Sequence, residues 1–371
     1  MDTGGIAPET PPPGNEAKSG TSVARVALVG YGLGGAAFHA PFIAAEPRLR
    51  LSAVVTRDPG RRAALARRYP DTAALDGVGE LLARIDEIDL VVVSTPNGTH
   101  VPIAEAVLER GRSMVVDKPV APTSAEVRHL AELAERVGTR IVPFHNRRWD
   151  GDFRTVRQLA ATGTLGSLLR FESRYERWQP EAPNGPQRAW KRERSPGAGI
   201  VYDLGTHIVD QAVVLFGRPR SVYAEIETRR PGAHVDDDVF IALRYREGPD
   251  VHLWTSAVAA CQGPRFRLLG SAGGYVKTGM DVQEAALVAG VSPASRGWGE
   301  EPEASWGRLV SLGGSAALPT LPGAYQQFYA GMAACLLDGA EPPVEVGDAV
   351  TVAEIIEAAR HSAESSAVVA L

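Results

Sequence analysis

The sequence predicts an α/β protein with two domains. Residues 23–146 contain short, continuous apolar runs, rich in Val and Ile, that alternate with helical patterns. This alternation is typical of a doubly wound parallel sheet, a Rossmann dinucleotide-binding domain, with helices on both faces. Residues 147–371 instead contain successive strand-like runs with few helices between them. They predict a C-terminal α/β domain with a large, open, mostly antiparallel sheet.

A glycine-rich turn follows the first predicted strand, residues 26–29, and leads into a helix-forming run. In such a turn the first glycine permits the bend, the second lets a pyrophosphate approach the backbone, and the third lets the helix pack on the sheet. The phosphates would sit at the helix N-terminus. A plain turn is the alternative, but the strand before it and the helix after it favour dinucleotide binding. The expected cofactor contacts are Gly30, Tyr31, Gly32, Leu33 and Gly35.

The remaining elements are predicted in order along the chain. The first domain has further strands at 51–56, 90–94, 114–116 and 141–144, and helices at 59–69, 101–110 and 124–137. The second domain has a helix at 153–161, a strand at 168–178, a proline-containing loop and a helix at 199–216. Strands follow at 221–228, 239–245, 251–258, 266–269 and 274–277. Residues 290–321, rich in Gly, Ser and Pro, are predicted to be loop, and two apolar stripes predict C-terminal helices.

Composition excludes several classes of protein. A net charge of -5 argues against nucleic-acid binding, which needs a concentrated basic face. The two cysteines, Cys261 and Cys335, lack CxxC spacing, so neither a disulfide framework nor a zinc-thiolate site is expected. We expect no bound metal. No segment has the length and apolarity of a membrane span. Residues 1–22 lack the apolar region of a signal peptide and are predicted to be a disordered tail, so a cytoplasmic location is expected.

The end of the second strand bears on the choice between NADP and NAD. NAD-binding domains usually place a carboxylate there for the ribose 2′-hydroxyl, whereas NADP-binding domains supply an arginine for the 2′-phosphate. Thr56 and Arg57 are the polar and cationic pair that a phosphate needs, while Asp58 could instead cap the next helix. We therefore expect NADP, with NAD possible, and a solvent-facing Arg57 is the alternative.

Polar residues follow two further strands of the first domain. The carboxyl ends of parallel strands line the ligand crevice of this fold. Lys118 follows the strand at 114–116 and would reach that crevice, although an isolated lysine is usually a surface residue. The turn and helix start after the strand at 90–94 offer cofactor contacts or, equally, turn, cap or structural residues: Ser94, Thr95, Pro96, Asn97 and His100.

A predicted helix in the second domain carries a second group of polar residues. Asp203 and His207 are spaced one helical turn apart and share a face. They could serve catalysis, form a solvated ion pair, or join Asp210 in a metal site. The metal site is the weakest of these interpretations, because the sequence offers no further His or Cys pair for it.

These motifs together resemble the Gfo/Idh/MocA family of oxidoreductases, over essentially the whole chain from residue 23. The family usually has Glu-Lys-Pro where this chain has Asp117-Lys118-Pro119. The likeness is greater still to the NADP-dependent scyllo-inositol dehydrogenase branch. It rests on the strings Gly30-Tyr31-Gly32-Leu33, Phe38-His39-Ala40-Pro41, His145-Asn146-Arg147-Arg148-Trp149-Asp150 and Tyr202-Asp203-Leu204-Gly205-Thr206-His207.

The resemblance implies that Lys118, Asp203 and His207 are the catalytic residues and that the open sheet forms the interface of a homo-oligomer, a dimer or tetramer. On this basis we expect hydride transfer between a nicotinamide and a carbinol or keto carbon of a cyclic polyol or sugar. His207 would be the acid/base, because an imidazole titrates near neutral pH. Lys118 would stabilise the alkoxide, and Asp203 would hold neighbouring hydroxyls.

Other residues of the second domain are weaker candidates for the substrate wall, because each could equally be a packed interface residue. They are His145, Arg147, Tyr175, Trp178 and Trp190. Two further functions remain as alternatives to a dehydrogenase. One is a glycoside hydrolase that uses its bound nicotinamide transiently, and the other is a non-catalytic NADP(H)-binding sensor. A small-molecule polyol or sugar is the expected partner, with no nucleic acid and no membrane.

Overall fold

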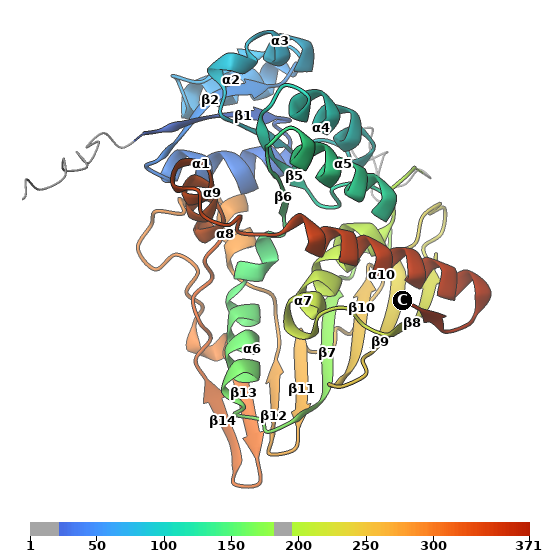
Figure 1. Cartoon of the computed structure of the whole chain (residues 1–371). Coiled ribbons are helices and arrows are strands. Elements are labelled where there is room, and N and C mark those ends of the chain that lie inside the picture. Colours follow the sequence, from blue (N-terminus) through green and yellow to red (C-terminus); the bar gives the residue numbers. More distant parts are fainter. Residues whose placement is uncertain (1–21, 182–194) are drawn as a thin grey trace, which may run out of the picture.

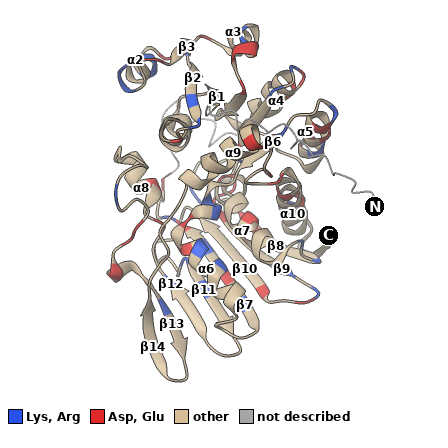
Figure 2. Cartoon of the chain, turned by 60° about the vertical axis from the view of Figure 1, so that its left-hand side comes forward, with Lys and Arg blue, Asp and Glu red and all other residues tan. Residues whose placement is uncertain are grey.

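A computed structural model of the chain describes residues 22–181 and 195–371. It has two lobes, each built on one β-sheet, and the C-terminal helices run between them (Figure 1). The expected tail, apart from residue 22, and Trp190 lie outside the described residues. Within the described ranges, no helix is both long and apolar enough to cross a bilayer. Acidic and basic positions are interspersed along both lobes (Figure 2).

The first sheet has six parallel strands in the order β3-β2-β1-β4-β5-β6. This is the doubly wound arrangement that the sequence predicts. The strands are β1 (Ala24–Val29), β2 (Leu49–Val55), β3 (Ala73–Leu75), β4 (Leu90–Val93), β5 (Ser113–Asp117) and β6 (Ile141–Phe144). The helices are α1 (Ala40–Ala45), α2 (Pro59–Arg68), α3 (Val78–Ala83), α4 (His100–Leu108) and α5 (Ser124–Arg136). The short β3 and α3 were not predicted, because three and six residues respectively are too few to show a clear periodicity.

Both faces of the first sheet are covered. Apolar residues of α3, α4 and α5 pack against one face. The other face packs against α1 and against α9 (Gln326–Asp338), whose Phe328 and Met332 share a core cluster with Val26 and Leu28 of β1. Helix α9 therefore belongs to the first core, although it lies within the 147–371 segment expected to form the second domain.

The second sheet has nine strands in the order β14-β13-β12-β11-β7-β10-β9-β8-β15. Only β7 and β10 pair in parallel; the other pairs are antiparallel. The strands are β7 (Leu168–Glu176), β8 (Ser221–Glu227), β9 (Asp238–Arg244), β10 (Asp250–Ser256), β11 (Phe266–Gly270), β12 (Gly274–Lys277), β13 (Gly307–Ser311), β14 (Gly314–Leu318) and β15 (Val369–Ala370).

Helices cover one face of the second sheet (Figures 1 and 2). They are α6 (Gly151–Thr162), α7 (Thr206–Phe216) and α10 (Val346–Ser365), which share one apolar core with β7, β8, β9 and β10. The opposite face carries Arg174, Phe240 and Trp254, whose rings and guanidinium contact one another. No helix of the described residues packs on that face.

The remaining helical segments are η1 (Gly34–His39), η2 (Ile85–Glu87), η3 (Asn97–Thr99), η4 (Asn146–Trp149), η6 (Val201–Gly205), α8 (Gln283–Val288) and η7 (Glu303–Ser305).

The prediction of loop for residues 290–321 was wrong in part. Strands β13 and β14 form a hairpin at the edge of the second sheet. Seven of their ten residues are exposed, Leu309 and Leu318 are partly exposed, and Gly307 is buried. An edge hairpin exposed on both faces lacks the apolar alternation by which strands are recognised.

Candidate active site

The glycine-rich turn has the geometry that a bound dinucleotide needs. Gly30 has φ +98°, and a Cβ there would lie 2.2 Å from the carbonyl oxygen of Ser94. A Cβ on Gly35 would lie 2.0 Å from the carbonyl oxygen of Gly30, so this glycine permits close packing of the following helical turn. A Cβ on Gly32 would meet nothing nearer than the Arg61 guanidinium, at 4.0 Å. The backbone of Gly32 therefore faces open space, which fits the approach of a pyrophosphate.

Arg61 is a candidate site residue that the sequence did not reveal. It lies in the first turn of α2, next to Arg62, and two adjacent arginines on a helix resemble ordinary solvated charge. Arg62 is tied to its own lobe by an ion pair with Asp76 at 2.5 Å and by bonds to backbone carbonyls. The Arg61 guanidinium has no such pair among the described residues and lies beside Gly32. It is therefore a candidate cation for a cofactor phosphate.

The three residues after β2, Thr56, Arg57 and Asp58, differ in burial and in their hydrogen bonds. Thr56 is buried, and its backbone N–H donates to the carbonyl of Leu75. The Arg57 side chain is exposed, and its Nε donates to the carbonyl of Asp76 at 2.8 Å. Asp58 accepts from the backbone N–H of Arg61 at 2.8 Å, so it is the N-cap of α2. The cap alternative for Asp58 is thus the one observed.

The residues after β4 lie where the first lobe meets the second. The Asn97 amide donates to the carbonyl of Gly197 in the other lobe at 2.8 Å, and Thr95 and Thr99 bond to each other. His100 is fully buried, and its two ring nitrogens lie 2.9 Å from the carbonyl oxygens of Thr95 and Pro119. These contacts are consistent with the structural alternative for His100.

Lys118 and Asp203 meet across the boundary between the lobes. Lys118 extends from the end of β5, and Asp203 lies in η6, a π-helical turn that precedes α7. The Lys118 ammonium donates to the Asp203 backbone carbonyl and lies 3.3 Å from its Oδ1. The lysine side chain is 17% exposed and the aspartate side chain 40% exposed. The structure thus brings together two residues that lie 85 positions apart in the sequence.

His207 lies on the first turn of α7 and is 7% exposed. Burial is the main cause that lowers the pKa of its imidazole well below the usual value, and the positive charge of Lys118 acts in the same direction, as do Arg147 and Arg265. Its Nδ1 is buried and has no hydrogen-bond partner among the described residues. The lowered pKa keeps the imidazole neutral near pH 7, so it is a candidate proton acceptor.

Asp210 does not complete a metal site with these residues. Its carboxylate pairs with the Arg148 guanidinium through contacts of 2.5 and 2.9 Å. No group of three or more His, Cys, Asp or Glu side chains in the described part of the chain has the arrangement of metal ligands.

Three candidates for the substrate wall, His145, Arg147 and Tyr175, are buried. Tyr175 is buried, and its ring stacks near His207 with a centroid separation of 6.4 Å. Its hydroxyl accepts from Arg147 at 2.6 Å, and Arg147 also pairs with Asp150 and Glu284. These contacts favour the packing alternative for Arg147 and Tyr175. Trp178, by contrast, is 55% exposed.

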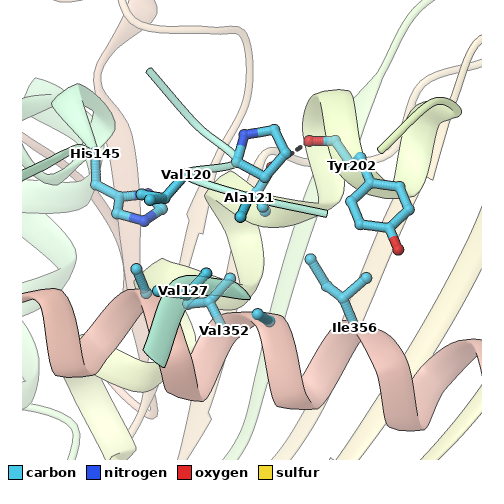
Figure 3. Close-up of a pocket in the computed structure, with 11 residues that line it drawn as sticks. Val120, Ala121, Val127, His145, Tyr202, Val352 and Ile356 are labelled. Carbon is cyan, nitrogen blue, oxygen red and sulfur yellow. Dashed lines mark hydrogen bonds between the residues drawn. The ribbon is translucent and has the colours of Figure 1, made fainter. Parts of the chain in front are cut away.

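His145 is also buried, and burial lowers the pKa of its imidazole. It lies at one end of a small apolar pocket (Figure 3). Side chains from α5 and α10 surround this pocket, including Val127, Val352 and Ile356. Because its lining is mostly apolar and includes neither Lys118 nor His207, this pocket is distinct from the place where those two residues lie.

Comparisons with known proteins identify the class of protein. Residues 24–145 match the family described as oxidoreductases with an NAD-binding Rossmann fold, and residues 153–276 match the GFO/IDH/MocA C-terminal domain. The chain therefore belongs to the Gfo/Idh/MocA family and is an NAD(P)-binding oxidoreductase.

Individual relatives extend over nearly the whole chain. The oxidoreductase YdgJ of Escherichia coli is 37% identical over 94% of this chain and 98% of its own length. The scyllo-inositol 2-dehydrogenase (NADP(+)) IolW of Bacillus subtilis is 31% identical over 94% of this chain and 96% of its own. The solved structure of the Bacillus subtilis oxidoreductase yvaA, at 30% identity, has a TM-score of 0.90 and covers 95% of this chain and 100% of that one.

The electrostatics of the site yield a test that needs no substrate. Replacing Lys118 with Met removes a positive charge that disfavours imidazolium, so the pKa of His207 should rise. Titration of isotopically labelled histidines by NMR measures this pKa, and a His207→Gln variant assigns the signal. Arg308→Met, which removes an exposed cation from β13, is the matched control and should leave the titration unchanged. A His207 pKa that is the same with and without Lys118 would contradict the assigned geometry.

Proposed function

We propose that the protein is an NADP(H)-dependent dehydrogenase that interconverts a carbinol and a keto carbon of a cyclic polyol or sugar, inositol-like in its array of hydroxyls. One observation carries the proposal: the Lys118 ammonium and the neutral His207 imidazole come together where the two lobes meet, near the glycine-rich turn. The relative named as an NADP-dependent scyllo-inositol dehydrogenase supports the choice of substrate class.

Each residue of the site has a distinct task in this reaction. The nicotinamide, when bound, supplies the hydride chemistry. Neutral His207 accepts the proton of the substrate hydroxyl during oxidation and returns it during reduction. The Lys118 ammonium stabilises the negative charge that develops on the oxygen. Asp203 accepts hydrogen bonds from neighbouring substrate hydroxyls. Its contact with the Lys118 ammonium also holds the ammonium in place.

The proposed preference for NADP rests on two guanidiniums. Arg57 follows β2 and Arg61 flanks Gly32, so both lie where the adenosine ribose of a dinucleotide binds in this fold. Guanidiniums form strong, geometrically specific hydrogen bonds to phosphate. NAD lacks the 2′-phosphate, so these groups would favour NADP over NAD.

The uncovered face of the second sheet, with Arg174, Phe240 and Trp254, supports a further part of the proposal. It fits an interface between two copies of the chain, because an exposed sheet face with packed aromatic side chains is typical of association surfaces. A homo-oligomer, dimer or tetramer, remains the proposed state.

Replacing His207 with Ala tests the proposed acid/base. We expect kcat to fall by about 10²- to 10⁴-fold, because general acid–base catalysis contributes that much. The measurement is NADPH absorbance with a panel of inositols, aldoses and their keto forms. Release of sugar without net change of cofactor would instead indicate the hydrolase, and cofactor binding with neither activity would indicate the sensor. Unchanged turnover of an identified substrate in the variant would exclude His207 from this role.

Replacing Arg61 with Ser tests the phosphate contact. Loss of one charge-assisted hydrogen bond, worth about 1.5–3 kcal/mol, should weaken NADPH binding by about 10- to 100-fold. Binding of NADH should change little, so the ratio of the two dissociation constants is the decisive quantity. Arg67→Ser, an exposed arginine in the last turn of the same helix, is the matched control. Equal weakening of NADH and NADPH would mean that Arg61 does not contact the 2′-phosphate.

A further inference from the structure

Two buried histidines hold the residues on either side of Lys118. The Nε2 of His39 lies 3.2 Å from Oδ1 of Asp117, whose Oδ2 accepts from the Ser94 hydroxyl at 2.6 Å. On the other side, the Nδ1 of His100 lies 2.9 Å from the carbonyl oxygen of Pro119. Both imidazoles are fully buried. The chain is thus fixed immediately before and immediately after Lys118.

The far side of His39 is held by the C-terminal part of the chain. Its Nδ1 lies 2.6 Å from the hydroxyl of Tyr329 on α9, and its ring packs on Phe144 with a centroid separation of 4.1 Å. Burial raises the pKa of the Tyr329 hydroxyl well above its usual value, so this hydroxyl keeps its proton and can donate it to Nδ1. His39 then carries its proton on Nε2 and donates to Asp117.

The carboxylate of Asp117 completes the chain of hydrogen bonds. Burial opposes its ionisation, but the interactions with His39 and Ser94 outweigh burial and lower its pKa. Every polar group in the series therefore has a partner: Tyr329 donates to His39, and His39 and Ser94 both donate to Asp117. A fully paired polar network within an apolar cluster favours one arrangement of its members over others.

Strand geometry connects this network to the ammonium. Asp117 is the last residue of β5 and Lys118 follows it directly, so fixing Asp117 limits where the lysine side chain begins. Asp117 contacts His39 of η1, whereas Lys118 contacts Asp203 in the other lobe. A Cβ on Gly34 would lie 2.6 Å from the Ser94 hydroxyl oxygen, so the network also lies directly behind the glycine-rich turn.

We propose that His39, oriented by Tyr329, is a positioning residue that anchors Asp117 and thereby sets where the Lys118 ammonium stands against Asp203 and the substrate. The catalytic consequence rests on the proposed function, whereas the placement of Lys118 does not. No proton passes between the network and Lys118 in this account. The network acts through geometry alone.

The test compares His39→Leu, which cannot donate to Asp117, with His39→Gln, whose side-chain amide can. We expect kcat to fall about 10- to 100-fold in His39→Leu, since small misplacements of a catalytic group have effects of this size. The Kd for NADPH should stay within about threefold, and His39→Gln should recover most of the loss. Ser362→Ala is the control for stability, because it removes a fully buried hydrogen bond between α10 and β8, far from the site. It should lower Tm and leave kcat unchanged.

A second readout needs neither cofactor nor substrate. The chain contains four lysines, so selective ¹³C-lysine labelling gives a simple NMR spectrum in which Lys118→Met assigns the Lys118 signal. We expect this signal to shift in His39→Leu and to return in His39→Gln. Tyr329→Phe, which keeps the ring, should shift it in the same direction and change the ¹⁵N signature of the His39 tautomer.

The outcomes separate the inference from the proposed function. An unshifted Lys118 signal in both His39→Leu and Tyr329→Phe would overturn the inference, as would a loss of kcat that His39→Gln does not recover. If the wild-type protein oxidises no polyol, the proposed function fails, while a Lys118 signal that shifts and recovers still supports the inference. If His39→Leu does not fold, the Lys118 NMR signal is compared in Tyr329→Phe, where a shift is expected, and in His39→Gln, where the wild-type position is expected.

Discussion

The contact between Lys118 and Asp203 joins the two lobes at the point where chemistry is proposed. The lysine belongs to the first sheet and the aspartate to the turn that begins α7, so the contact forms only when the lobes are docked. Docking in turn depends on the C-terminal helices, since α9 packs on the first sheet and α10 shares the core of the second. The placement of one ammonium group is therefore a consequence of the whole fold.

The charges around His207 explain why this position carries a histidine in its neutral form. Burial alone disfavours imidazolium, and Lys118, Arg147 and Arg265 disfavour it further. Arg147 pairs with Glu284, and this pairing outweighs burial and lowers the pKa of the Glu284 carboxyl, whereas burial raises the pKa of Asp150 well above its usual value. The Glu284 carboxylate therefore compensates the guanidinium charge.

The sequence predicted the elements that obey a simple periodicity. The five longer strands of the first sheet and the helices between them were confirmed, because buried parallel strands are continuous apolar runs. The hairpin of β13 and β14 was missed because it is exposed on both faces, and β3 because it is too short. Of the candidate site, the sequence predicted Lys118, Asp203 and His207, and their roles stay predictions. It did not predict Arg61, because its neighbour Arg62 forms an ordinary ion pair with Asp76 and the two arginines are alike in the sequence. The role of His39 depends on Tyr329, which lies 290 residues away, so no local pattern could reveal it.

A crystal structure with bound NADP⁺ and a non-reacting polyol tests the central claim most directly. The account predicts that the Lys118 ammonium and the His207 imidazole both lie within hydrogen-bonding distance of the same substrate hydroxyl, on the carbon that faces C4 of the nicotinamide. It also predicts the ribose 2′-phosphate beside Arg57 and Arg61. A complex in which either Lys118 or His207 is turned away from that hydroxyl would contradict the account.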